Sequence, residues 1–99
     1  MGHKLPPREL ELYKRCDEVL HYIWDPIGVR DAPGARDEYH SYLPQVFSLV
    51  RDGADSQRVE AYLLEIERDR MGLSGSPEGA RVAAGVLLSW REWLWEHAA

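Results

Sequence analysis

Apolar side chains recur along this chain with the spacing of helices. Four segments place apolar residues three and four apart on one face, at about 7–24, 36–52, 56–71 and 77–97. No segment alternates with the period of a strand. We therefore predict an all-α fold, a compact four-helix bundle-like single domain over residues 1–99.

Capping and turn-forming residues set the ends of these segments. Pro26 stops the first, because the residue before a proline is disfavoured in helical geometry. Gly53 suits the left-handed end of the second, and Ser76 followed by Pro77 suits the start of the fourth. Pro44 lies inside the second segment, where the apolar spacing continues in phase. We therefore expect a kinked helix at Pro44 rather than a break.

The link between the first two segments, residues 25–35, is longer than the usual helix–helix connection of about 2–8 residues. It opens with the stretch Trp24-Asp25-Pro26-Ile27-Gly28. We expect Trp24 and Ile27 to be apolar anchors and the Asp25 side chain to accept a nearby backbone N–H, as aspartate does in turns. This stretch would then end the first helix and hold the long loop on the core.

Four residues around the loop suggest an alternative, a small enzyme or metal-binding protein. Asp25, Asp37, Glu38 and His40 could bind a cation or supply general acid–base groups. Their spacing does not follow a calcium loop, and Asp37 and Glu38 point to different sides of a helix. We expect no metal and no cofactor, and keep these four as candidates.

Catalytic nucleophiles have no supporting motif. Cys16 is the single cysteine, so no intrachain disulfide can form, and it lies in the apolar stripe of the first segment. No histidine pair shows the i, i+4 spacing of a helical zinc site. We therefore predict no catalytic residues and a protein that is not an enzyme.

The C-terminal segment carries two apolar stripes. The main one is centred on Trp90, and its members are Val82, Ala83, Val86, Leu87, Trp90, Trp93 and Leu94. A second lies on the other side, at Ala84, Leu88 and Trp95. We interpret the second stripe as a candidate interface, because exposed apolar patches and tryptophan mark binding surfaces. Two other readings stay open: a helix buried on two sides, or a terminus packed on the long loop.

The charge balance narrows the partners. The formal net charge is -5, which disfavours a nucleic-acid backbone or an anionic membrane surface. The apolar run at 82–88 is too short to span a bilayer, and the N-terminus lacks a secretory apolar run. We expect a cytoplasmic protein whose partner is a protein or a second copy of itself.

The loop residues also carry a resemblance. Trp24 to Gly28, followed by Asp37-Glu38-Tyr39 with Tyr42 one turn on, resembles the YugE-like family of small bacterial proteins of unassigned function. The resemblance covers the first half of the chain. It implies a single helical domain and no particular activity, and it marks Trp24 to Gly28 and Tyr39 as a structural signature.

Together these patterns predict a non-enzymatic protein–protein interaction domain. One concrete form is an immunity-type protein that covers a basic toxin with carboxylates, with association accelerated by electrostatic attraction. Another is homo-oligomerisation through the Leu88 and Trp95 stripe.

Overall fold

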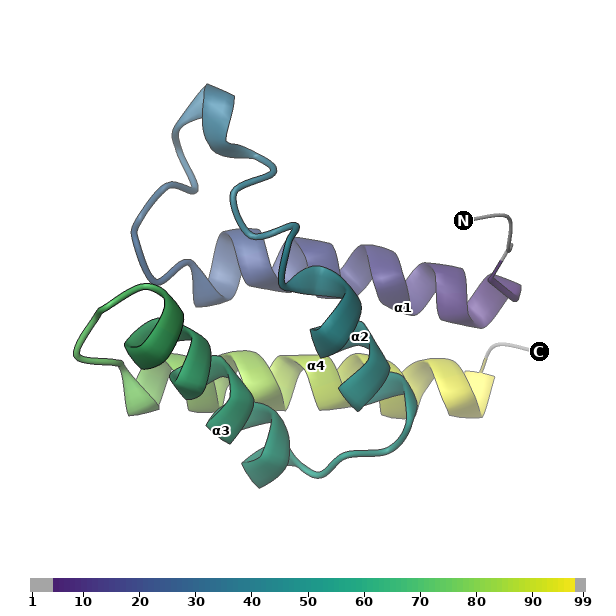
Figure 1. Ribbon diagram of the computed structural model, residues 1–99. Coiled ribbons are helices and arrows are strands. Elements are labelled where there is room, and N and C mark those ends of the chain that lie inside the picture. The colour runs from purple at the N-terminus through teal and green to yellow at the C-terminus, as the bar shows by residue number, and fades with distance from the viewer. Residues whose placement is uncertain (1–4, 98–99) are drawn as a thin grey trace.

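The computed structural model describes residues 5–97, which form four α-helices, and their arrangement is shown in Figure 1. They are α1 (Pro7–Glu18), α2 (Leu43–Arg51), α3 (Ser56–Glu65) and α4 (Pro77–His97). Within residues 5–97 there is no strand, so the all-α prediction is confirmed. No helix in this part of the chain is both long and apolar enough to cross a bilayer.

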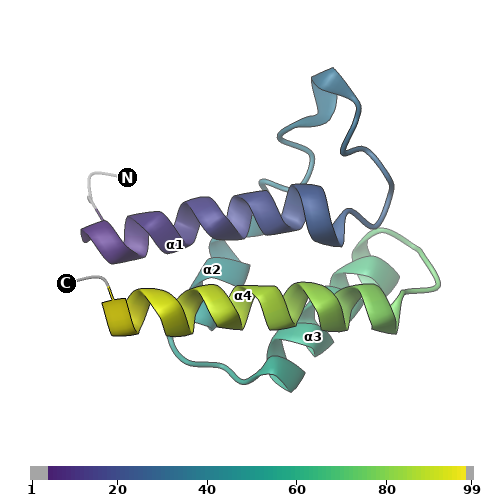
Figure 2. The ribbon, with the colours of Figure 1, turned by 180° about the vertical axis from the view of Figure 1, so that it is seen from behind.

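The helices form two layers. α1 and α4 lie side by side and antiparallel, so that the start of α1 and the end of α4 share one end of the molecule (Figure 1). α2 and α3 pack across one side of this pair. Seen from behind, α4 runs across the front with α2 and α3 behind it (Figure 2). Among residues 5–97, no other helix therefore covers the outer side of α4.

Two of the helices end in π-helical turns, which change the direction of their side chains. α1 continues as η1 (Val19–Trp24) and α3 as η3 (Ile66–Arg70). In η1 the Asp25 N–H donates to the carbonyl of Leu20, five residues back, at 3.0 Å. The wider turn brings Trp24 onto the line of Val19 and leaves Ile23 exposed. Regular helical spacing of the first segment predicts Ile23 on its apolar side, and that prediction is wrong, since Ile23 is 39% exposed.

One core fills the space between the two layers. Its fully enclosed aliphatic members come from all four helices, which makes the domain a single packing unit. They include Leu12, Val46, Val50, Val59, Leu63, Ile66 and Leu87. The apolar positions of the third segment at helical spacing are all buried, namely Val59, Tyr62, Leu63 and Ile66.

The second helix starts later than its apolar spacing indicated. α2 begins at Leu43 with Pro44 in its first turn, so both the start at residue 36 and the kink at Pro44 are wrong. A proline has no N–H to donate and fits a first turn better than an interior one. Residues 36–42 form successive turns instead, and Tyr42 donates its N–H to Tyr39 at 3.0 Å. The loop therefore runs from Asp25 to Tyr42.

The other helix ends follow their capping signals. Gly53 takes a left-handed φ of 92° after α2, and Asp55 caps α3 by accepting the N–H of Arg58 at 2.8 Å. Ser76 accepts the N–H of Gly79 at 3.2 Å and thereby caps α4, with Pro77 as its first residue. These signals are local, which is why the sequence alone located them.

A buried carboxylate ties three elements together. Glu67, in η3, is only 2% exposed. Its Oε2 accepts the indole N–H of Trp24 at 2.8 Å, and its Oε1 accepts the backbone N–H of Ser76 at 2.8 Å. Both oxygens thus have donors, which compensates for the loss of water around the charge. The contact joins η1, η3 and the start of α4.

We expect Glu67→Gln to lower the free energy of unfolding by about 1–3 kcal/mol. Both carboxylate oxygens accept hydrogen bonds, so an amide must present its NH₂ group to one of the two donors. Urea unfolding followed by circular dichroism measures the change. Glu65→Gln, an exposed position two residues earlier, is the control and should differ from wild type by less than about 0.5 kcal/mol. Equal stability of the two variants would contradict this role for Glu67.

Candidate functional site

Asp25 occupies the junction between η1 and the long loop in an unusual backbone conformation. Its φ of 33° is the single positive φ at a non-glycine position among residues 5–97. Aspartate and asparagine tolerate this left-handed region better than most side chains. Pro26 follows it, and Gly28 takes a φ of 72° in the next turn. The chain therefore reverses sharply here, and the Asp25 side chain points into the bend.

The Asp25 carboxylate is saturated with donors from the loop. Oδ1 accepts the N–H of Val29 at 2.8 Å and the hydroxyl of Tyr39 at 2.7 Å. Oδ2 accepts the N–H of Arg30 at 3.1 Å and its side-chain Nε–H at 3.2 Å. The Tyr39 hydroxyl in turn accepts the N–H of Ile27 at 3.2 Å. One buried carboxylate thus fixes both ends of the loop.

The environment of this carboxylate sets its titration. Burial alone would raise the pKa of Asp25, but the hydrogen bonds from Tyr39, Val29 and Arg30 outweigh it and hold the pKa below its ordinary value. Burial, and then the bond to Asp25, raise the pKa of Tyr39. At neutral pH the pair is therefore an ionised carboxylate that accepts from a neutral phenol.

The expected role of the signature stretch is confirmed for two of its residues and wrong for one. Trp24 is buried and Asp25 does accept backbone N–H groups. Ile27 is not an apolar anchor, since it is 43% exposed. What Ile27 contributes is its backbone N–H, which binds Tyr39. The sequence showed the turn at Asp25 but not its hydrogen bond with Tyr39, fourteen residues further along the chain.

A second polar contact holds the loop against α1. Both guanidinium nitrogens of Arg36 donate to the Asp17 carboxylate, at 2.9 and 3.0 Å, and His40 Nε2 lies 3.0 Å from Oδ1 of Asp17. Burial opposes ionisation of Asp17, yet Arg36 and His40 together hold its pKa below the ordinary value. Arg36 also lies over the ring of Tyr22. Loop and helix are thus clamped at both Asp25 and Asp17.

The four candidate ligands do not meet. Asp25 is engaged by Tyr39 and the loop backbone, whereas His40 binds Asp17 on α1. Asp37 and Glu38 are exposed. Within residues 5–97 no three His, Cys, Asp or Glu side chains are placed to share a metal ion. The acidic and histidine residues of the loop therefore form anchors to two different places rather than one centre.

Two further reactive side chains are enclosed. Cys16 is fully buried, and burial followed by the nearby Asp17 charge raises the pKa of its thiol to about 12, so the thiolate does not form near neutral pH. His21 is buried in η1, with Nε2 at 3.3 Å from the carbonyl oxygen of Arg30. That oxygen can only accept, so Nε2 carries the proton. Nδ1 has no hydrogen-bond partner among residues 5–97.

The predicted interface stripe on α4 lies largely inside the protein. Ala84 is fully buried, which contradicts its assignment to an exposed stripe. Leu88 and Trp95 are half-buried against the core, and Arg8 and Arg91 cover the indole of Trp95 at 4.2 and 4.7 Å from its centroid. Leu88 and Trp95 lie beside Gly53 and Ala54 in the connection between α2 and α3, which the pattern of a single helix could not show.

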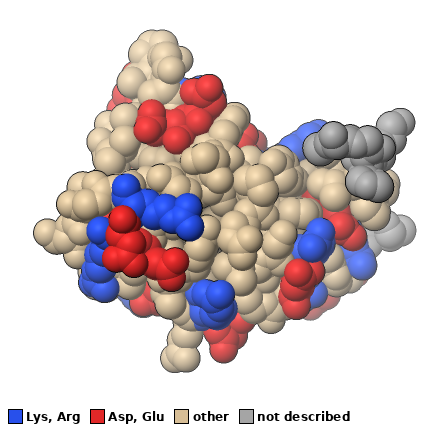
Figure 3. Space-filling model, in the orientation of Figure 1, with Lys and Arg blue, Asp and Glu red and all other residues tan. Residues whose placement is uncertain are grey.

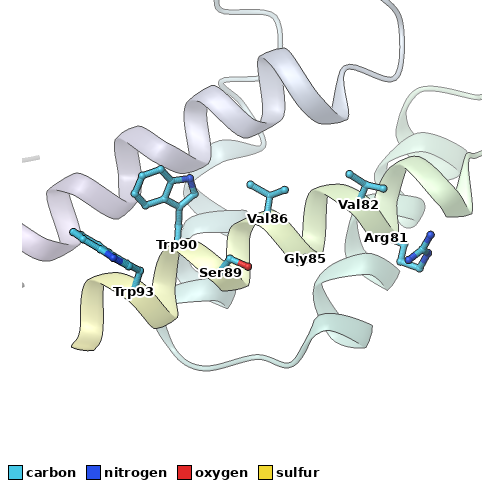
Figure 4. A pocket seen from close by; sticks show the side chains of 7 residues that line it. All are labelled: Arg81, Val82, Gly85, Val86, Ser89, Trp90 and Trp93. Carbon is cyan, nitrogen blue, oxygen red and sulfur yellow. The ribbon is translucent and has the colours of Figure 1, made fainter. Parts of the chain in front are cut away.

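The exposed apolar surface of α4 is instead the outer edge of its main apolar stripe. Val82 is 43% exposed and Trp93 52%. With their neighbours they line a shallow groove of about 660 Å³, formed by Arg81, Val82, Gly85, Val86, Ser89, Trp90 and Trp93. Figure 4 shows Val82, Val86 and Trp90 projecting from α4 on the side where α1 lies, with Trp93 beyond them. We call this surface the α4 groove.

Stacking keeps the aromatic end of the α4 groove in place. The rings of Trp93 and His97 are stacked, with 4.7 Å between their centroids and 19° between their planes. Trp93 also lies edge-on to Trp90, with 6.4 Å between the ring centroids. Arg15 of α1 lies over the Trp90 ring at 5.0 Å. Trp90 is thus held against α1, whereas Trp93 is held by His97 and exposes its outer side to solvent. An exposed, fixed tryptophan is typical of a binding surface.

Gly85 forms the floor of the α4 groove. A Cβ built at this position would have no atom within 4 Å apart from its own helix backbone and chain neighbours. Glycine in a helix interior costs about 0.5–1 kcal/mol relative to alanine. No contact within the described part of the chain requires a glycine here, so Gly85 lowers helix stability without improving the packing of these residues.

Charge is mixed rather than concentrated. On the face shown in Figure 3, basic and acidic side chains alternate without a continuous basic band. On the opposite side, Arg81 is the one charged residue that lines the α4 groove, and none of its lining residues is acidic. The net negative charge therefore lies outside the groove.

The fold and the site together define a small all-α domain with a clamped loop and one apolar groove on its longest helix. Comparison of the chain with family models, with curated proteins and with solved structures finds no match. The resemblance to the YugE-like family therefore stays a prediction, and the function has to be argued from the groove itself.

We expect Asp25→Asn to lower the free energy of unfolding at pH 7 by about 2–3 kcal/mol, because the bonds to a charged acceptor are lost. Asparagine also tolerates the left-handed backbone, so the change isolates the charge. The wild-type contribution is complete above the unfolded pKa of about 4 and is lost as the pH falls through the lower folded value. Urea unfolding from pH 7 to pH 2 should give a flatter acid limb for the variant. Parallel curves would contradict the role of Asp25.

Proposed function

We propose that this protein is a non-enzymatic interaction domain that binds an amphipathic helix of a partner protein in the α4 groove. The observation that supports the proposal is the uncovered outer face of α4, where Val82 and Trp93 are exposed around a glycine floor. Scattered exposed apolar residues are normal, but a contiguous apolar hollow with a fixed tryptophan is typical of interfaces.

The shape and chemistry of the groove favour a helix as the occupant. It follows α4 from Arg81 to Trp93, about 18 Å at 1.5 Å per residue. Its walls are apolar and aromatic, and Ser89 and Arg81 supply the polar groups. A partner helix can lay an apolar stripe along such a surface without leaving backbone groups unpaired, because its own N–H and C=O groups are already bonded.

The other candidate functions have less support. A small enzyme or metal-binding protein is disfavoured, because the side chains of Asp25 and His40 are engaged in separate contacts that hold the loop. An immunity-type role against a basic toxin is supported by the net charge of -5. It predicts an association rate that falls steeply as salt is raised, and it would place the contact on acidic surface outside the α4 groove.

Site-specific photo-crosslinking tests the proposal. With benzoylphenylalanine at position 93, irradiation in an extract of the source cells should give a discrete adduct. Its crosslinked peptide should carry apolar residues at helical spacing, because Trp93 lies at the exposed end of the groove. The adduct should disappear when Gly85→Gln fills the groove floor, and mass spectrometry measures both results.

The matched control carries the same crosslinker at position 10. Leu10 is 44% exposed on α1. It lies seven residues before Asp17, on the side of α1 that holds the loop rather than the side facing Trp90. Adducts that are equal at positions 10 and 93, or that persist in Gly85→Gln, would contradict a specific function of the α4 groove.

A further inference from the structure

We infer that the helix bound in the α4 groove is α4 of a second copy of this chain. The two helices cross antiparallel at Ser89, and Trp93 of each copy packs on Gly85 of the other. This inference rests on the proposed function and names its partner. The argument comes from the order of residues along the groove, from Gly85 and from the charges at its two ends.

The exposed row of α4 is self-complementary. Residues four apart form one ridge on a helix surface, and the ridge along the groove is Arg81, Gly85, Ser89, Trp93 and His97. A two-fold axis at Ser89 relates positions equally far before and after it. Gly85 of one copy then faces Trp93 of the second copy, and the reverse contact is identical, as an isologous interface requires. The large exposed side chain of Trp93 thus packs on Gly85, which has no side chain.

The small residues at the centre permit a close crossing. Gly85 has open space where its side chain would be, and Ser89 is exposed. Packing of such ridges against each other is the commonest helix-pair class, with a crossing angle of about -50°. A second helix packed over Gly85 and Ser89 would explain the glycine, because the absence of a side chain lets the two helices approach closely. Val82 and Val86 then flank the contact.

Charge complementarity favours the antiparallel direction. Arg81 lies at the N-terminal end of the groove, whereas the exposed carboxylates of Glu92 and Glu96 lie near its C-terminal end. Antiparallel crossing at Ser89 brings Arg81 of each copy beside Glu96 of the second copy. It also places this cation near the negative end of the second helix. A parallel pair would set Arg81 against Arg81 and Glu96 against Glu96.

The groove fits a second copy better than a basic partner. None of its lining residues is acidic, so a cationic helix would meet a counter-charge only at one end, from Glu92 and Glu96. The net charge of -5 on each copy opposes association over longer distances, and salt screens that repulsion. A dimer held by the α4 groove should therefore persist at high salt, whereas a complex with a basic protein should weaken.

A disulfide trap at the two-fold axis tests the geometry directly. Ser89→Cys should form a covalent dimer in oxidised glutathione, because facing residues at a close helix crossing lie within the roughly 4–7 Å between Cα atoms that a disulfide needs. The native Cys16 is fully buried and does not compete. Lys14→Cys, exposed on α1, is the control and should stay monomeric. No covalent dimer of Ser89→Cys, or equal dimer from both variants, would overturn the inference.

Sedimentation of the full chain, from about 1 µM to about 1 mM, gives the matching equilibrium test. Wild type should show a monomer–dimer equilibrium that Gly85→Gln weakens at least about tenfold. Gly85→Gln should fold normally, since the position is open and glutamine favours helices. Arg81→Glu and Glu96→Arg should each weaken the dimer, and the double variant should restore it. A dimer indifferent to all of these substitutions would overturn the α4 contact.

The outcomes separate this inference from the proposed function. A wild type that stays monomeric, without a Ser89→Cys disulfide, overturns self-pairing. If position 93 then crosslinks to another protein and not to this chain, the groove keeps its function with a different partner. If position 93 gives no adduct at all, both proposals fail.

Discussion

The structure depends on the burial of one carboxylate, Asp25, at the point where the first helix ends. The ionised oxygens accept from Val29, Arg30 and Tyr39, so this buried charge is the main anchor of a loop of eighteen residues. The second anchor is the contact between Arg36 and Asp17. A buried charge is costly unless every lone pair finds a donor. Here two of the four donors are backbone N–H groups of the loop, which would otherwise need partners of their own. Solvating the charge and ordering the loop are therefore the same event.

Glu67 extends this principle to the other layer. Its carboxylate joins Trp24 to the start of α4, so both carboxylates act within one residue of the end of η1. The π-helical turns η1 and η3 make this arrangement possible, because Trp24 and Glu67 both point into the core from these wider turns. α1, the loop and α4 are thereby fixed relative to each other, and the two-layer packing follows.

That packing also explains why α4 carries an apolar groove. α1 covers one flank of α4 and α3 the other, while nothing in the described chain covers the outer side. Val82, Val86 and Trp93 extend the apolar surface beyond what the core uses. Gly85 adds open space in their midst. A helix built only for this core would carry polar side chains and no glycine at these positions, and it is this surplus that supports an interaction function.

The sequence alone determined the all-α class, the helix ends at Gly53 and Ser76, and the turn at Asp25, because capping and turn chemistry act over a few residues. It did not determine the start of α2. Apolar residues on both sides of Pro44 keep helical spacing, and this spacing is the same whether residues 36–42 form a helix or a series of turns that leads into α2. It also misplaced the surface of α4. The pattern predicts Ala84 on an exposed stripe, yet Ala84 is fully buried, whereas Trp93 of the main stripe is 52% exposed. A periodic pattern gives the apolar sides of a helix, but only the positions of the neighbouring helices decide which of them is covered.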